Sequence, residues 1–165
     1  MVRIAIIDDG INSKILLPKC KIHHYYVSKD YQILQTRSNL HSLSHGTICG
    51  GVIISNTCVE HEIISIKVKR TDQNGNIEKL CAALKFCLKN NIDVVNISLG
   101  TRNTDDAKIL YNIVLKMEKK NIIVVSAMDN NPMERAFPAC FDNVIGVKHS
   151  MKAYKGTLIR ETQTC

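Results

Sequence analysis

The sequence predicts an α/β fold with three layers, in which a mostly parallel sheet carries helices on both faces. Apolar strand-like runs alternate along the chain with segments whose apolar residues recur at helical spacing. Alternation on this scale is typical of strand, helix, strand units and of a parallel sheet. With 165 residues, 45% of them hydrophobic and 22% charged, the chain has the size and composition of one globular domain with one core.

The first strand is predicted at Val2–Ile7, an apolar run typical of a strand buried on both faces. Asp8, Asp9 and Gly10 follow at its carboxyl end, and binding and catalytic residues of parallel sheets lie at such strand ends.

Further strands are predicted at Ile63–Val68 and Asp93–Ile97. A helix between them begins after the turn-like segment 72–76, and its apolar residues have helical spacing: Ile77, Leu80, Cys81, Leu84, Cys87 and Leu88.

A second helix is predicted from Thr104, because its charges follow the helix dipole. Acidic residues occupy its first turn and basic residues its last: Asp105, Asp106, Lys116, Lys119 and Lys120. Strands at Ile122–Ala127 and Val144–Val147 complete the sheet. We therefore expect one domain over residues 1–147 and a C-terminal tail without periodicity over 148–165.

Composition argues against several function classes. The formal net charge is +7, but lysine and arginine are spread along the chain with few aromatic residues among them, so we expect no nucleic-acid partner. No apolar run approaches the roughly 20 residues that span a bilayer, so we expect no membrane partner. The N-terminus shows no secretory signal, and the seven cysteines form no CxxC pair. These features predict a reduced, cytoplasmic protein.

Two residues have the chemistry needed to activate a hydroxyl nucleophile. Such a nucleophile needs an imidazole to accept its proton and a carboxylate to hold that imidazole in the right tautomer. Asp8 closes a buried strand, and His45 opens the small-residue segment 46–51, which we expect to begin a helix. Glycines in this segment allow close packing of that helix against its neighbours.

Three short motifs occur in the order that marks the subtilisin-like serine proteases: IAIIDDG at residues 4–10, SHGT at 44–47 and NISLG at 96–100. The chain resembles this subtilase family over nearly all of residues 2–147. By that resemblance Asp8 is the orienting acid and His45 the general base. The stretch 121–130 resembles the strand and turn of the oxyanion hole, which implies that Asn130 donates to the oxyanion.

The resemblance also implies a substrate-binding segment and a specificity pocket. Ser98, Leu99 and Gly100 match the strand edge that pairs with substrate backbone. Met128 and Asp129 replace small residues beside the primary pocket, and we expect that pocket to be shrunken or to prefer cations. A Phe-Pro sequence at residues 137–138 matches a site that is often cis in the family.

The main departure from the family is the nucleophile, because no Gly-Thr-Ser-Met-Ala-like turn occurs in the sequence. We therefore expect a C-terminally incomplete serine endopeptidase fold that is inactive as the isolated chain. A completing polypeptide would carry the serine, and the substrate is a peptide or protein. Residues 55–62 are too short for the family's calcium loop, so no metal and no cofactor are assigned.

Two alternatives remain open at this point. A non-catalytic pseudoprotease would bind peptides through residues 98–100 and cut nothing. A receiver-like phospho-signalling domain would use Asp8 and Asp9 for magnesium, with Ser126 and Lys148 completing its layout. The receiver reading is weakened by Asn96, which stands where the phosphoacceptor aspartate belongs. Outside that reading, Asp9 is interpreted as a turn residue.

Overall fold

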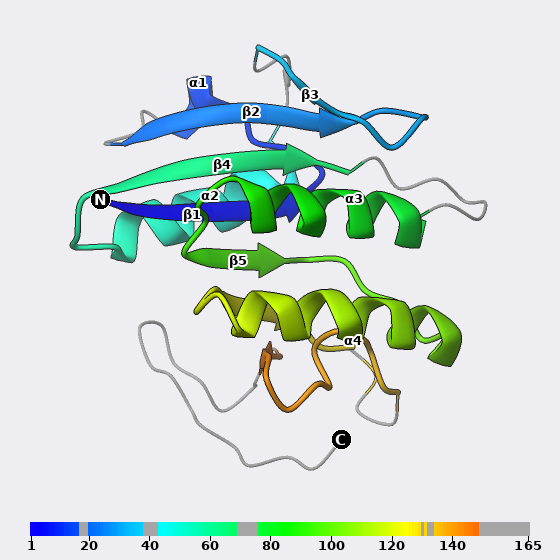
Figure 1. Cartoon of the computed structure of the whole chain (residues 1–165). Helices are drawn as coiled ribbons and strands as arrows, with labels where there is room; N and C mark the ends of the chain where they lie inside the picture. The colour runs from blue at the N-terminus through cyan, green and yellow to red at the C-terminus, as the bar shows by residue number, and fades with distance from the viewer. Residues whose placement is uncertain (17–19, 38–42, 69–75, 130, 132–133, 149–165) are drawn as a thin grey trace.

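A computed structural model describes residues 1–16, 20–37, 43–68, 76–129, 131 and 134–148. One sheet runs through it, with the strand order β3-β2-β4-β1-β5-β6-β7 (Figure 1). Neighbouring strands are parallel except β2 and β3, which pair antiparallel. The strands are β1 Val2–Asp8, β2 Lys21–Val27, β3 Ile33–Gln35, β4 His61–Lys67, β5 Val94–Ile97, β6 Ile123–Ala127 and β7 Ile145–Val147.

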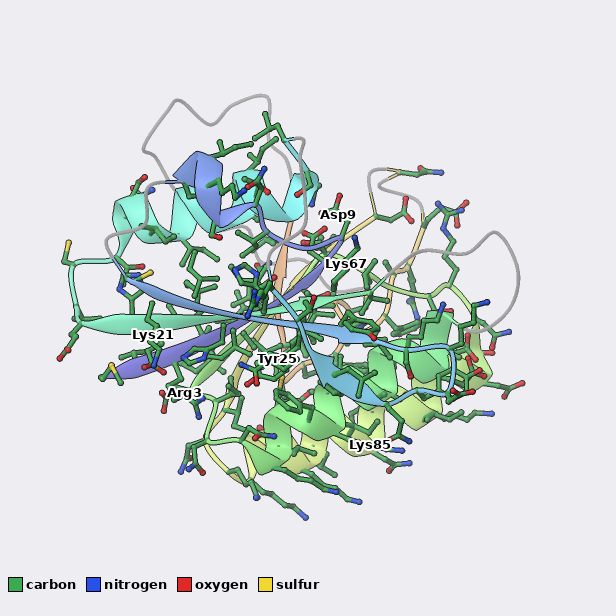
Figure 2. The ribbon with its side chains drawn as sticks, turned by 90° about the horizontal axis from the view of Figure 1, so that it is seen from above. Arg3, Asp9, Lys21, Tyr25, Lys67 and Lys85 are labelled. Carbon is green, nitrogen blue, oxygen red and sulfur yellow. The ribbon has the colours of Figure 1, made fainter. Side chains whose placement is uncertain are left out.

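Helices cover both faces of the sheet, which gives the predicted three layers. Figure 2 shows helices on both sides of the sheet. One face carries α1 and α2, and the other carries α3 and α4. Their bounds are α1 Ser13–Leu16, α2 His45–Asn56, α3 Asn76–Lys89 and α4 Thr104–Glu118.

The core follows from alternation along the buried strands. On β1, Ala5 and Ile7 belong to the large cluster under α3 and α4, whereas Ile4 and Ile6 belong to the smaller cluster under α1 and α2. Burial of one such isoleucine side chain stabilises a fold by about 1.5–3 kcal/mol. Because β1 lies at the centre of the sheet and contributes to both clusters, the carboxyl end of this strand is firmly placed.

Sequence patterns predicted five of the seven strands and both long helices of the chain's second half, within a residue or two at each end. They did not predict β2 and β3. The β2 sequence is KIHHYYV, and only its last residue is buried, so it lacks the apolar run that identifies the central strands. β2 is nevertheless ordered by its parallel pairing with β4.

One part of the α1/α2 face is left uncovered by the residues that the structure describes. Ile123, Ile145 and Val147 on β6 and β7 are 50%, 55% and 41% exposed. Val124, which points to the opposite face of β6, is buried in the cluster under α4. We call the exposed side chains of Ile123, Ile145 and Val147 the β6–β7 face. It is an apolar surface that the described residues leave open to solvent.

Candidate active site

The predicted site residues follow the carboxyl ends of three adjacent parallel strands. Asp8 ends β1, Ser98 follows β5 and Met128 follows β6. Pairing aligns Ile7 with Ile97, and Ile97 with Ser126. The topology therefore brings these residues to one edge of the sheet, where ligands bind in open parallel sheets.

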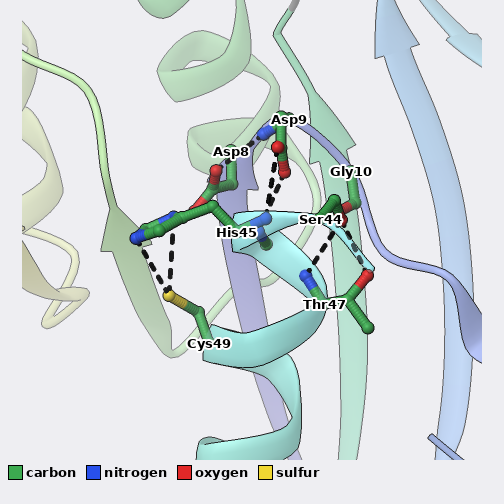
Figure 3. A network of polar contacts seen from close by, with 8 residues as sticks. Asp8, Asp9, Gly10, Ser44, His45, Thr47 and Cys49 are labelled. Atoms are coloured by element: carbon green, nitrogen blue, oxygen red, sulfur yellow. Dashed lines mark hydrogen bonds and ion pairs between the residues drawn. The ribbon is translucent and has the colours of Figure 1, made fainter. Parts of the chain in front are cut away.

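Asp8 and His45 are in direct contact. The Nδ1 atom of His45 lies 2.8 Å from Oδ2 of Asp8 (Figure 3). A carboxylate only accepts hydrogen bonds, so Nδ1 carries the proton and Nε2 keeps its lone pair. Asp8 is buried at 4% exposure, whereas the imidazole is 64% exposed. A fixed carboxylate thus orients an imidazole that a substrate can reach.

Asp9 has a structural role that the sequence did not reveal. Its Oδ1 accepts a hydrogen bond of 2.8 Å from the backbone N–H of Gly46, and its Oδ2 accepts one of 3.2 Å from the backbone N–H of His45. These are among the first N–H groups of α2, which have no partner within the helix. A carboxylate here also complements the positive end of the helix dipole. Asp8 and Asp9 therefore hold the side chain and the backbone of His45 respectively.

The N-terminus of α2 is tied to the loop after β1 by hydroxyl groups. Ser44 is the N-cap; its Oγ accepts from the backbone N–H of Thr47 and donates to the carbonyl of Gly10 at 2.8 Å. Thr47 is fully buried, and its Oγ1 accepts a 2.8 Å hydrogen bond from the backbone N–H of Asn12. In the Ser-His-Gly-Thr motif, Ser44 and Thr47 therefore bind the first turn of α2 to the loop that follows β1.

Gly46 is required by the closeness of this docking. A Cβ atom added to it would lie 2.6 Å from the carbonyl oxygen of Gly10 and 3.0 Å from Cβ of Asp8. Any side chain at this position would push α2 away from β1.

Cys49 is a further member of the site that sequence reasoning missed. It lies one helical turn after His45, with Sγ 3.7 Å from Nδ1 and 3.9 Å from Nε2 of that residue. Burial raises the pKa of the Cys49 thiol, and the nearby Asp8 raises it further, while a hydrogen bond with the Ser98 side chain acts in the opposite direction. The i, i+4 spacing of His45 and Cys49 was the available signal.

The segment 98–100 leaves β5 with backbone groups available. Ser98 still donates its N–H to the carbonyl of Ile7 at 3.2 Å, but within the described residues no hydrogen bond reaches the backbone of Leu99 or Gly100. Thr101 then pairs with Phe137 through two hydrogen bonds of 2.9 and 2.8 Å.

A segment that follows β6 packs against the end of this stretch. The peptide bond between Phe137 and Pro138 is cis, as expected. A Cβ added to Gly100 would lie 2.8 Å from the carbonyl oxygen of Phe137, so the two segments are in contact. Met128 donates its N–H to the carbonyl of Val147 at 2.8 Å.

A charged cluster follows Met128. Asp129 accepts hydrogen bonds from the backbone N–H of Asn131 at 2.9 Å and from Nε of Arg102 at 2.9 Å. Arg102 also contacts Glu134 at 3.2 Å. The Asn131 N–H and the Arg102 guanidinium lower the pKa of Asp129. The predicted oxyanion residue Asn130 lies outside the described residues.

Comparison with known proteins decides the family. The model of the subtilase (peptidase S8) family matches residues 1–164. The chain belongs to the subtilase family. The subtilase relative "Minor extracellular protease Epr" of Bacillus subtilis (strain 168) is 30% identical over 156 residues, which are 88% of this chain and 23% of Epr.

Solved subtilase structures share the fold. The epidermin leader peptide processing protease EpiP of Staphylococcus aureus superposes with a TM-score of 0.67 at 18% identity, over 88% of this chain and 45% of EpiP. The nisin leader peptidase NisP of Lactococcus lactis superposes with a TM-score of 0.62 at 17% identity, over 88% and 55%. The chain therefore spans about a quarter of the length of Epr and about half of these two solved chains.

Among the described residues, no helix is both long and apolar enough to cross a membrane.

Proposed function

We propose that this chain supplies the acid–base part of a subtilisin-like serine endopeptidase. The observation that carries the proposal is the 2.8 Å contact between the buried Asp8 carboxylate and Nδ1 of the exposed His45. Asp8 orients the imidazole, and Nε2 of His45 accepts the proton of an attacking serine hydroxyl and later returns it to the leaving amine. The catalysed reaction is hydrolysis of a peptide bond in a peptide or protein substrate.

The remaining predicted roles belong to this proposal. The Asn130 side-chain amide donates to the oxyanion, and removing such a donor costs about 100-fold to 1000-fold in turnover. The backbone of Leu99 and Gly100 pairs with an extended substrate, and the finding that no described residue forms a hydrogen bond with this backbone supports that role. Met128 lines the specificity pocket. Because Arg102 already neutralises Asp129, the geometry gives less support to a cation preference than to a shrunken pocket.

We propose further that the serine comes from a completing polypeptide. No subtilase serine motif occurs in the sequence. The β6–β7 face is an apolar surface on the same side of the sheet as α2 and next to the strands whose ends hold the site. A helix or strand packed there would be adjacent to the site that His45 serves, and it would remove exposed apolar side chains from water.

The two alternatives differ in their support. The pseudoprotease reading shares the substrate segment 98–100 and differs only in catalysis, so an experiment must separate it. The receiver-like reading has less support, because both carboxylate oxygens of Asp9 accept N–H groups from α2. A magnesium titration that detects tight binding at Asp8 and Asp9 would revive the receiver reading.

The test uses the native protein from its source and a fluorophosphonate probe, which labels activated serines. We expect the label on a species heavier than the 18.5 kDa of this chain, either covalently or in a complex with it. The substitution His45→Ala should lower the labelling rate by at least about 1000-fold, with His45→Gln as a variant of similar shape. Near-normal labelling of both variants would remove His45 from the mechanism. An unlabelled 18.5 kDa species whose peptide affinity is unaffected by His45→Ala would establish the pseudoprotease instead.

A further inference from the structure

Three metal-ligating side chains meet at the junction of β1 and α2. Asp8, His45 and Cys49 each offer one ligand atom, and the three atoms lie within 4.8 Å of one another. Figure 3 shows the thiol under the imidazole, with the Asp8 carboxylate beside the same ring. We propose that these three residues form a binding site for a zinc ion, and that zinc competes with the use of His45 as a base. The competition rests on the proposed function, whereas the binding itself does not.

One of the three ligand separations is already close to that of a tetrahedral zinc site, and the Asp8 and Cys49 ligand atoms lie within 4.8 Å of each other. Zinc bonds of ~2.0–2.1 Å to nitrogen or oxygen and ~2.3 Å to sulfur place neighbouring ligand atoms roughly 3.3–3.6 Å apart. The separation of Cys49 Sγ from His45 Nδ1 is 3.7 Å, which is close to this range. Sγ is almost as near to Nε2, at 3.9 Å, so the thiol lies against the ring and the imidazole must turn before Nδ1 and Sγ can share an ion. The Asp8 and His45 atoms are at the hydrogen-bond distance of 2.8 Å and must separate by about half an ångström. The exposed imidazole can rotate to allow this movement.

Two of the ligands are held in place by neighbours. Oδ1 of Asp8 accepts the backbone N–H of Asp9 at 2.7 Å, which leaves Oδ2 directed at the imidazole. The Cys49 thiol has the Ser98 side chain as a hydrogen-bond partner. Outer partners of this kind orient ligands and raise metal affinity, typically by 10-fold to 100-fold. Helix α2 places His45 and Cys49 next to each other, since residues at i and i+4 lie on one face of a helix.

The donor set selects the class of metal. A thiolate and an imidazole favour zinc over the hard cations magnesium and calcium, which prefer all-oxygen sites. Three protein ligands leave one position of a tetrahedral zinc open to water. Within the part of the chain that the structure describes, no second group of three such side chains is present.

Protons move when zinc binds. The Cys49 thiol loses its proton to solvent, because a coordinating thiol is deprotonated. The His45 proton shifts from Nδ1 to Nε2, since Nδ1 now binds the metal. The hydrogen bond to Asp8 is thereby replaced by two bonds to zinc. With Nε2 protonated, His45 cannot accept the proton of a serine, so the zinc-bound form is inactive.

The first test titrates the full chain with Co²⁺, whose thiolate charge-transfer absorption reports a cysteine ligand directly. We expect one tetrahedral site per chain with a charge-transfer band that added Zn²⁺ removes, and no such response to Mg²⁺. Cys49→Ser should abolish the band and weaken zinc binding by roughly 100-fold, whereas Cys58→Ser, which changes an exposed cysteine, should leave both unchanged. A band that survives Cys49→Ser, or that disappears with Cys58→Ser, would overturn the proposal.

A second measurement stays informative if a variant fails to fold. In the unaltered chain, the imidazole nitrogen resonances of His45 should change on addition of one equivalent of Zn²⁺, with Nδ1 showing the larger shift. Unchanged His45 resonances at saturating Zn²⁺ would exclude the site. In the native protein, Zn²⁺ should slow fluorophosphonate labelling, and Cys49→Ser should remove this effect.

These readouts separate the two proposals. Cobalt binding at Cys49 without any serine labelling would support the metal site and remove the protease function. Serine labelling in a protein whose cobalt spectrum has no thiolate band would do the reverse.

Discussion

Replacing Gly46 by alanine tests whether the contact between α2 and the end of β1 is as tight as the structure has it. The new Cβ would lie 2.6 Å from the Gly10 carbonyl oxygen and 3.0 Å from Cβ of Asp8. The first of these atoms belongs to the backbone and the second is a Cβ atom, so no side-chain rotation can move either of them away. The helix must move outward, and it carries His45 with it.

Two opposing effects set the magnitude. Alanine in a helix is favoured over glycine by roughly 0.5–1 kcal/mol. Overpacking of a close contact costs typically about 1–3 kcal/mol. The clash therefore exceeds the gain, and we expect Gly46→Ala to lower the free energy of unfolding by about 0.5–2 kcal/mol.

Gly51→Ala is the matched control, because it lies in the same helix and meets only Cδ2 of Leu16, the far end of a flexible side chain, at 3.1 Å. In urea unfolding followed by circular dichroism, a slope of about 2 kcal/mol/M converts the expected loss for Gly46→Ala to a midpoint roughly 0.3–1 M lower. The control should have an unchanged or higher midpoint. The His45 imidazole resonances should also shift in Gly46→Ala alone. If Gly46→Ala is as stable as Gly51→Ala, the close approach of α2 to β1 is refuted.

Two further predictions concern ionisable groups away from the Asp8–His45 pair. Arg102→Ala should raise the pKa of Asp129 towards its ordinary value, with the N–H of Asn131 preserving part of the lowering; a carbon-detected NMR titration of the carboxylate measures this. The lowered pKa of Asp129 in the folded chain adds stability above the unfolded-state pKa, and this stability is lost as the pH falls through the folded-state pKa. Arg102→Ala reduces that stability, so its acid unfolding should begin at higher pH. An unchanged titration of Asp129 would mean that the ion pair does not form in solution. Burial raises the pKa of Cys87 to about 12, so this thiol should resist a disulfide reagent until the chain unfolds, whereas the exposed Cys58 should react at once; fast modification of Cys87 in the folded chain, located by peptide mass analysis, would contradict its burial.

The central strands of the sheet could be predicted from the sequence because a local apolar run specifies each of them. The Val2–Ile7 run is apolar where both faces are covered, and that pattern needs no knowledge of the rest of the chain. β2 could not be predicted in this way, because its polar and aromatic residues form a strand only once β4 offers its edge. Tertiary pairing decided the structure where the local pattern was weak.

The same division holds at the site. Asp8 and His45 could be proposed as a pair because their motifs are contiguous in sequence and chemically specific. The cap formed by Asp9 could not be predicted. It requires the Asp9 carboxylate to meet the N–H groups of His45 and Gly46, which follow Asp9 by 36 and 37 positions. Cys49 was not identified, because a thiol in an apolar stretch is usually a packing residue and the i, i+4 spacing from His45 was the one sign of their contact.

The paired carboxylates at the end of β1 also bear on how freely the intervening chain can vary. Asp8 holds the His45 ring and Asp9 holds its backbone, so a single dipeptide fixes this residue from across a gap of 36 positions. A turn of the intervening segment that contacts neither α2 nor β4 can therefore vary in length without altering the imidazole's placement, provided that Ser44, Asn12 and the strand end keep their contacts. Residues 28–32, which form the turn between β2 and β3 and lie away from those contacts, are the place in this chain where an inserted recognition peptide or reporter should be accommodated.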